Sequence, residues 1–106
     1  KMLRLMGDNG KPNDNMLMHI LSPYPEHRSA LTDCTKLTSA GFTSRTALLI
    51  YGYEYSEWPM EPAIKSFELL ANQSVTLGIR HQAKTQQLVH PIHSQGRVFS
   101  WEIFSN

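Results

Sequence analysis

The chain is 106 residues long, with 41% hydrophobic and 18% charged residues and a formal net charge of +1. This length predicts one domain over residues 1–106, and the composition is that of a globular protein rather than a disordered one. The small charge gives no electrostatic argument for nucleic acid or a membrane as partner. No apolar run approaches the roughly 20 residues of a transmembrane helix. The one cysteine, Cys34, excludes an internal disulfide framework and is typical of cytoplasmic proteins.

The N-terminal part of the chain predicts a β-hairpin. Residues 2–6 and 16–21 are rich in apolar side chains and are expected to form its two strands. The loop between them contains Asn9 and Gly10, which are typical of tight turns that need positive φ angles. Residues 22–28 contain two prolines, and because each proline pushes the preceding residue towards extended geometry, no helix is expected there.

A first helix is predicted over residues 30–40. Ser29 precedes it and can accept a hydrogen bond from a free amide of the first turn, while Gly41 stands where a helix end favours a left-handed residue. Cys34 lies on the apolar face and away from the helix N-terminus, so we predict a small core residue and not a thiol nucleophile. The apolar face is predicted to hold Leu31, Cys34, Leu37 and Thr38.

A buried strand followed by a second helix is the densest signal in the chain. Residues 47–53 form an uninterrupted apolar run, so this strand is expected to be covered on both faces. Residues 62–71 are predicted to form the helix, since Pro62 suits its first turn and Asn72 can end it. The buried stripe of this helix is predicted to be Ala63, Ile64, Phe67, Leu70 and Ala71.

The last third of the chain is expected to be rich in strands. Residues 75–80 and 88–92 are candidates, and Pro91 places the second of them towards an edge because proline cannot donate to a ladder. After a turn at 94–96, a half-buried strand is predicted in which Val98, Ser100 and Glu102 alternate with Phe99, Trp101 and Ile103. The order ββαβαβββ predicts an α/β (or α+β) domain with a single mixed sheet and two covering helices.

Three blocks of sequence carry a resemblance to a known superfamily. Residues 28–37, residues 47–55, and residues 88–93 together with 96–102 resemble blocks of uncharacterised bacterial proteins that look like relatives of the restriction-endonuclease-like superfamily. The resemblance implies a core made of a β-meander, a helix and a further strand. The superfamily's catalytic signature is an acidic residue followed by Glu-x-Lys on the neighbouring strand, which together hold a divalent metal. Neither early strand carries Glu-x-Lys or Asp-x-Lys, so the resemblance is kept for architecture and not for activity.

The loop after the predicted central strand is the main candidate site. Aromatic rings in this loop could stack a base or a sugar or anchor a protein partner, and its two carboxylates could act as an acid and base pair. The aromatic residues are expected to border the largest concavity, with Glu54 directed into it. The alternative is that the rings cap the core and both glutamates are solvated. The candidate ligand-binding residues are Tyr53, Glu54, Tyr55, Glu57 and Trp58.

Three histidines are secondary candidates. Zinc can be held by three imidazoles, but His90 and His93 stand three apart and would point to opposite faces of a strand. The chain has no His-Glu-x-x-His and no Cys-x-x-Cys, so no metal site is predicted, and His81, His90 and His93 are expected to be structural or surface residues. The glycines match no phosphate-binding loop, so no cofactor is predicted either. The sequence assigns no catalytic residue.

Basic side chains near these histidines are the sequence's only support for nucleic acid. Arg80, Lys84 and Arg97 could gather into one positive zone with them, although a solvated face is the expected alternative.

Two functions from different classes remain. The first is a non-catalytic binding or assembly module that uses the aromatic and acidic loop and forms a homodimer through its C-terminal strands. Four apolar residues, Phe99, Trp101, Ile103 and Phe104, lie within six positions near the chain end. One edge of the C-terminal hairpin, whose other strand holds Pro91, is expected to be poorly covered by the domain itself. The alternative to the dimer is that these residues complete the monomer's core. The second function is a metal-dependent, nuclease-like hydrolase with ligands from Asp8, Asp14, Glu54 and the histidines. The missing motif favours the first.

Overall fold

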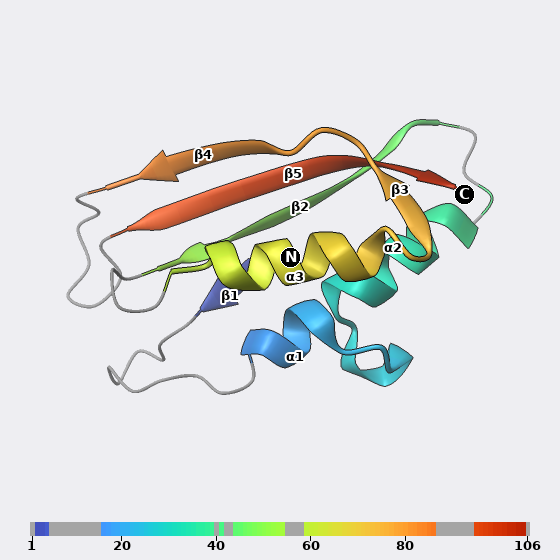
Figure 1. Cartoon of the computed structure of the whole chain (residues 1–106), viewed down its shortest axis with the longest axis horizontal. Helices are drawn as coiled ribbons and strands as arrows, with labels where there is room; N and C mark the ends of the chain where they lie inside the picture. Colours follow the sequence, from blue (N-terminus) through green and yellow to red (C-terminus); the bar gives the residue numbers. More distant parts are fainter. Residues whose placement is uncertain are drawn as a thin grey trace.

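The fold is a single five-stranded mixed sheet with its helices on one side (Figure 1). A computed structural model describes residues 2–4, 16–39, 41, 44–54, 59–86 and 95–105. The α/β class with one mixed sheet is therefore confirmed. In chain order the elements are β1 (Met2–Arg4), α1 (Met16–Leu21), a 3-10 turn (Pro25–His27), α2 (Ala30–Ser39), β2 (Thr46–Tyr53), α3 (Glu61–Ala71), β3 (Val75–Leu77), β4 (His81–Thr85) and β5 (Gly96–Ser105).

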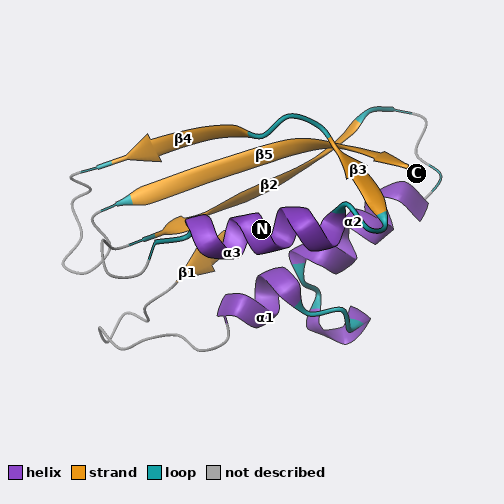
Figure 2. Ribbon diagram, in the orientation of Figure 1, coloured by secondary structure: helices purple, strands orange, loops and turns teal. Residues whose placement is uncertain are grey.

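The C-terminal strand β5 lies at the centre of the sheet (Figure 2). β2 pairs with it antiparallel along one edge, and β3 and β4 pair with it antiparallel along the other. β1 adds to the far side of β2 in parallel. Both edges of β5 are therefore occupied. The edge predicted to lack a partner belonged to the hairpin that β5 was expected to form with residues 88–92, which lie outside the described residues, so that expectation stays a prediction.

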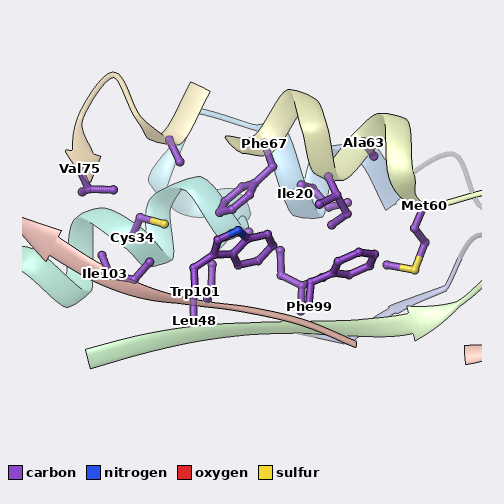
Figure 3. Packing of buried hydrophobic residues seen from close by; sticks show 14 residues of the cluster. Ile20, Cys34, Leu48, Met60, Ala63, Phe67, Val75, Phe99, Trp101 and Ile103 are labelled. Atoms are coloured by element: carbon purple, nitrogen blue, oxygen red, sulfur yellow. The ribbon is translucent and has the colours of Figure 1, made fainter. Parts of the chain in front are cut away.

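The core lies between the sheet and the helices (Figure 3). Phe99, Trp101 and Ile103 are buried on β5, which confirms the predicted alternation and places them in the monomer's own core. Phe67 of α3 is fully buried, and its ring centroid lies 5.0 Å from that of Trp101. The predicted stripe of α3 is confirmed except at Leu70, which is exposed because it lies at the margin of the helix face that meets the sheet.

Local signals explain where α2 begins and how its end is marked. The amide of Thr32 donates to Oγ of Ser29 at 3.3 Å, which is the predicted N-cap. Gly41 has a φ of +71°, in the left-handed region that glycine adopts without strain.

The end of α3 is tied to the sheet by one side chain. The Asn72 side-chain amide donates to the Glu68 carbonyl at 2.9 Å, and its oxygen accepts from the Leu77 amide at 3.1 Å. Asn72 therefore ends α3, as predicted, and also holds the start of β3 against it.

The prediction of an N-terminal hairpin is wrong. Residues 16–21 form α1, and β1 pairs in parallel with β2 instead. A run of six mostly apolar residues is compatible with either a strand or a buried helix, so periodicity cannot separate them. The helix is formed because it buries Ile20 in the core shared with α2 and α3. The turn at Pro25–His27 also corrects the expectation of no helix in 22–28, since proline suits the first position of a 3-10 turn.

The strand at 75–80 is shorter than predicted, and the next strand lies elsewhere. β3 ends at Leu77, and the candidate strand 88–92 falls in a segment outside the described residues. β4 occupies the position beside β5 that we expected for that candidate. Its five residues are all exposed, so no apolar alternation marked it as a strand.

Candidate functional site: the open face of the sheet

The candidate loop is described only at its start. Tyr55, Glu57 and Trp58 lie outside the described residues, as do His90, His93, Asp8 and Asp14. Tyr53 is half-buried at the end of β2, and Glu54 follows it. Ligand binding by this loop therefore stays a prediction, and only Tyr53 and Glu54 can be placed.

Glu54 is a buried structural carboxylate, only 4% exposed. Its Oε2 accepts from the Met60 amide at 3.0 Å, where α3 begins, and its Oε1 lies 3.1 Å from Nη1 of Arg97. Its own amide donates to the Gln95 carbonyl at 3.0 Å, which extends the pairing of β2 with β5. The expectation that Glu54 is directed into an open concavity is wrong, because both carboxylate oxygens already have partners within the fold.

Glu54 belongs to a cluster that joins α3 to the sheet, here called the ion-pair cluster. It consists of Arg80, Arg97, Glu54, Glu61 and Glu68. Arg80 donates to Glu61 at 2.7 Å and to Glu68 at 2.5 and 3.0 Å. Three carboxylates face two guanidinium groups, so Arg80 and Arg97 bring no excess positive charge to this part of the surface. Among the described residues, Arg80 and Arg97 therefore no longer support a basic surface that would bind nucleic acid.

The cluster is anchored in the aromatic core. Nε1 of Trp101 donates to Oε2 of Glu68 at 2.9 Å, which satisfies the only polar atom of that buried side chain. The Arg97 and Arg80 guanidinium groups lie 4.6 and 5.5 Å from the Phe99 ring centroid. The hydrogen bonds from Arg80 lower the pKa of the Glu68 carboxyl below its ordinary value of 4.5, against the opposing effect of burial.

The opposite face of the sheet, here called the open face, is covered by no helix among the described residues (Figure 1). Leu48 and Ile50 of β2 are buried, whereas the alternating Leu49 and Tyr51 are 45% and 44% exposed. The expectation that β2 is covered on both faces is therefore wrong, because all the described helices lie on the same side. Tyr51 stands beside Val98 of β5, which is itself 36% exposed.

A groove runs along the open face beside the junction of β3 and β4. It encloses about 560 Å³ and is lined by Ala47, Gly78, Ile79, His81, Ser100, Trp101, Glu102 and Phe104. Its lining includes the small residues Ala47, Gly78 and Ser100, and it also includes Phe104 and Ile79, which are 45% and 82% exposed. The amide of Gly78 donates to the Glu102 carbonyl at 2.7 Å, and a Cβ on Gly78 would lie 3.3 Å from the Cβ of Glu102. Glycine thus permits the close approach of the two chains.

The concavity beside Tyr53 is smaller. It encloses about 140 Å³ between Tyr51, Tyr53, Arg97 and their neighbours, against about 560 Å³ for the groove. Because Tyr55 and Trp58 lie outside the described residues, the expectation that they border the largest concavity together with Tyr53 stays a prediction.

Among the described side chains of the open face, charge is sparse and locally balanced. Arg45 donates from two nitrogens to Glu102, at 2.7 and 2.5 Å, which raises the pKa of the guanidinium and lowers that of the carboxyl. His81 is exposed beside Ser100 on the neighbouring strand. The open face is thus apolar along Leu49, Tyr51 and Val98, with one ion pair at its margin.

Catalytic groups are not assembled in the described part of the chain. Burial raises the pKa of the Cys34 thiol to about 11, and the Asp33 carboxylate adds to this, so the thiolate is scarce at neutral pH. Oγ of Ser22 lies 2.6 Å from Nδ1 of His27 and accepts from the Tyr24 amide, which closes the proline-containing turn. Within the described residues, no three side chains of the metal-binding types gather to hold an ion.

Over the described residues, the fold is a two-layer α/β arrangement in which all the described helices lie on one face of the sheet (Figure 1). Comparisons with protein families, curated proteins and solved structures find no match to this chain. No described helix is long and apolar enough to cross a membrane. The restriction-endonuclease-like resemblance stays a prediction.

Proposed function

We propose that this chain is a non-catalytic assembly module and that its open face binds a second copy of the chain to form a homodimer. The supporting observation is the row of exposed apolar side chains, Leu49, Tyr51 and Val98, at the middle of a sheet face over which no described helix lies. Side chains of this kind form the buried centre of protein interfaces. The C-terminal strand contributes through its outward face, and not through a free edge.

The size of the open face suits a dimer. β5 has ten residues, which at about 3.3 Å per residue extend about 33 Å. Three full strand positions, about 4.8 Å apart, make the face about 15 Å wide, or about 500 Å² in projection. The accessible area of the side chains that stand on it is larger than this projection. A stable interface takes about 800 Å² of accessible surface from each partner, so covering the face accounts for most of one interface.

Electrostatics do not oppose the pairing of two copies. The formal net charge is only +1, and Arg45 and Glu102 on this face already neutralise each other. Two sheets can pack face to face about 10 Å apart with their side chains interdigitated. Tyr51 and Leu49 would then lose the solvent contact that they have in the monomer.

A dilution series with matched variants tests the proposal. Light scattering should give a dimer mass for the parent at high concentration and a lower mass after hundredfold dilution. Leu49→Glu places a carboxylate at the centre of the open face and should give a monomer at every concentration. The control is Leu69→Glu, because Leu69 is 75% exposed on α3 and far from the open face. A parent that is monomeric throughout, or a Leu49→Glu variant that remains dimeric, would contradict the proposal.

A further inference from the structure

We infer that the free edge of β4 binds an extended segment of another protein, in which acidic side chains alternate with apolar ones. The binding mode is the addition of a strand to an exposed sheet edge. It uses the edge of the sheet and not the centre of the open face, so it does not require the proposed homodimer. β4 pairs only with β5 among the described strands, which leaves its other edge without a partner there.

The direction of the hydrogen bonds identifies the free backbone groups. In an antiparallel ladder, successive residues direct their N–H and C=O groups to opposite sides of the strand. Just before β5, the Gln95 carbonyl accepts from Glu54 on the β2 side, whereas the Glu102 carbonyl accepts from Gly78 on the β3 side. The odd-numbered residues of β5 therefore face β2, and its even-numbered residues face β3 and β4.

This parity carries over to β4 through the register. The even-numbered residues of β5 pair with His81, Ala83 and Thr85, which consequently direct their backbone groups into the sheet. Gln82 and Lys84 alternate with them and direct their N–H and C=O groups outward. The edge thus offers two donors and two acceptors to an incoming strand.

The side chains of β4 define the chemistry of that strand. On the helix side of the sheet, Lys84 is exposed beside Arg97 and has no acidic partner among the described residues. The neighbouring Arg97 is itself paired with Glu54. The neighbouring Gln82 accepts from Arg80 at 3.3 Å and from Arg97 at 3.2 Å. A carboxylate on the added strand would therefore meet a cation and amide donors here.

On its other side, the edge carries one apolar residue, Ala83, which lies between His81 and Thr85. On the open face, Ala83 stands beside Val98, which in turn stands beside Tyr51. Apolar side chains of an added strand would extend this row. Alternation along one strand thus favours acidic residues beside Lys84 and apolar residues beside Ala83.

A second copy of β4 is a poorer occupant of this edge. The strand contains Lys84 but no acidic residue, so two copies would bring two ammonium groups and no carboxylate to pair with them. Natural edges are often protected by proline or by several lysines, whereas β4 contains one lysine and no proline.

Amide hydrogen exchange with short peptides tests the inference. The probes are a seven-residue peptide of alternating Val and Glu, and the same peptide with Lys in place of Glu. The Val/Glu peptide should slow exchange of the Gln82 and Lys84 amides at least about tenfold at saturation. The amide of Ala83 is already bonded within the sheet and should change much less. For so short an edge, a dissociation constant of about 10⁻⁴ to 10⁻³ M is expected.

Two variants at one position separate the backbone from the charge. Lys84→Pro removes an outward N–H while keeping the bonds to β5, and proline is tolerated at such edge positions; it should weaken peptide binding at least about tenfold. Lys84→Thr keeps the N–H and should bind the Val/Glu peptide, with a reduced preference over the Val/Lys peptide.

Three results would overturn the inference. The first is equal binding of the two peptides to the parent, and the second is undiminished binding of the Val/Glu peptide to Lys84→Pro. The third is slower exchange of the Gln82 and Lys84 amides as the protein concentration rises without peptide, which would assign the edge to a second copy. The parent measurement needs no variant, so misfolding of Lys84→Pro would not remove the test. Repeating the titration with Leu49→Glu keeps the outcome separate from that of the homodimer.

Discussion

Replacing Phe67 by alanine should lower the free energy of unfolding by about 3 to 5 kcal/mol. Phe67 is fully buried between α3 and β5, against the Trp101 ring. An unfilled cavity of about 80 Å³ costs about 2 kcal/mol at about 24 cal/mol per Å³. The lost burial of the ring adds roughly 2 kcal/mol more. A domain of this size has about 5 to 15 kcal/mol in total, so the variant should lose a large part of its stability.

Urea unfolding followed by circular dichroism measures this loss. With an m value of about 1.5 kcal/mol per M, the midpoint should fall by about 2 to 3 M. Leu69→Ala is the matched control, because Leu69 lies on the same helix but is largely exposed, and it should change stability by no more than about 0.5 kcal/mol. A Phe67→Ala midpoint equal to that of the parent would refute the burial of this ring and the packing of α3 on the sheet.

Three further predictions concern single groups. Because the pKa of the Cys34 thiol is raised to about 11, a thiol reagent at pH 8 should modify the native protein at least about tenfold more slowly than the protein in urea, and equal rates would contradict its burial. Because the pKa of the Glu68 carboxyl is lowered in the folded protein, its stabilising contribution is present above pH 4.5 and is lost as the pH falls through the folded pKa. Glu68→Gln should therefore be less stable than the parent at pH 7 and should lose less stability between pH 5 and 3. Parallel profiles of stability against pH for the variant and the parent would count against this. Gly78→Ala forces a contact with Glu102 and should cost about 1 to 3 kcal/mol in urea unfolding, so an unchanged midpoint would show that β5 can move away.

The charged residues of the ion-pair cluster have a structural role in this domain and are not available to bind a ligand. Glu54, Arg97 and Glu68 are buried or half-buried charged side chains in ion pairs, and such networks occur at functional sites as well as in purely structural ones. Here each has a partner within the fold, and together they join α3 to the sheet. The surfaces that remain available are the open face and the β4 edge. Both suit contacts with other chains, whereas the hydrolase alternative stays a prediction without support from the described residues.

The two proposed surfaces lie at right angles and can act together. A dimer formed through the open face would leave the outward backbone groups of Gln82 and Lys84 at its margin. An added strand would extend the apolar row that begins at Tyr51, so dimerisation and peptide binding can influence each other through Val98 and Ala83. Titrating the peptide into the parent and into Leu49→Glu measures that influence directly.

The sequence by itself determined the elements with strong local signals. Ser29 and Gly41 flank α2, Pro62 lies in the first turn of α3, and the alternation through Phe99 and Trp101 identifies β5 and its buried face. These signals act within a few residues, through capping, backbone geometry and side-chain period, so they could be read without the fold.

The tertiary structure alone decided which surfaces of these elements meet and which stay exposed. Residues 16–21 could form a strand or a helix, and burial of Ile20 selected the helix. The apolar run of β2 did not show that its Leu49 side would lack a covering layer, since this depends on all the described helices lying on one side of the sheet. Glu54 was expected in a cleft, but Arg97, 43 residues later in the chain, holds it in the interior. Pairings between distant residues depend on register and on layer order, and no local pattern in the chain specifies either.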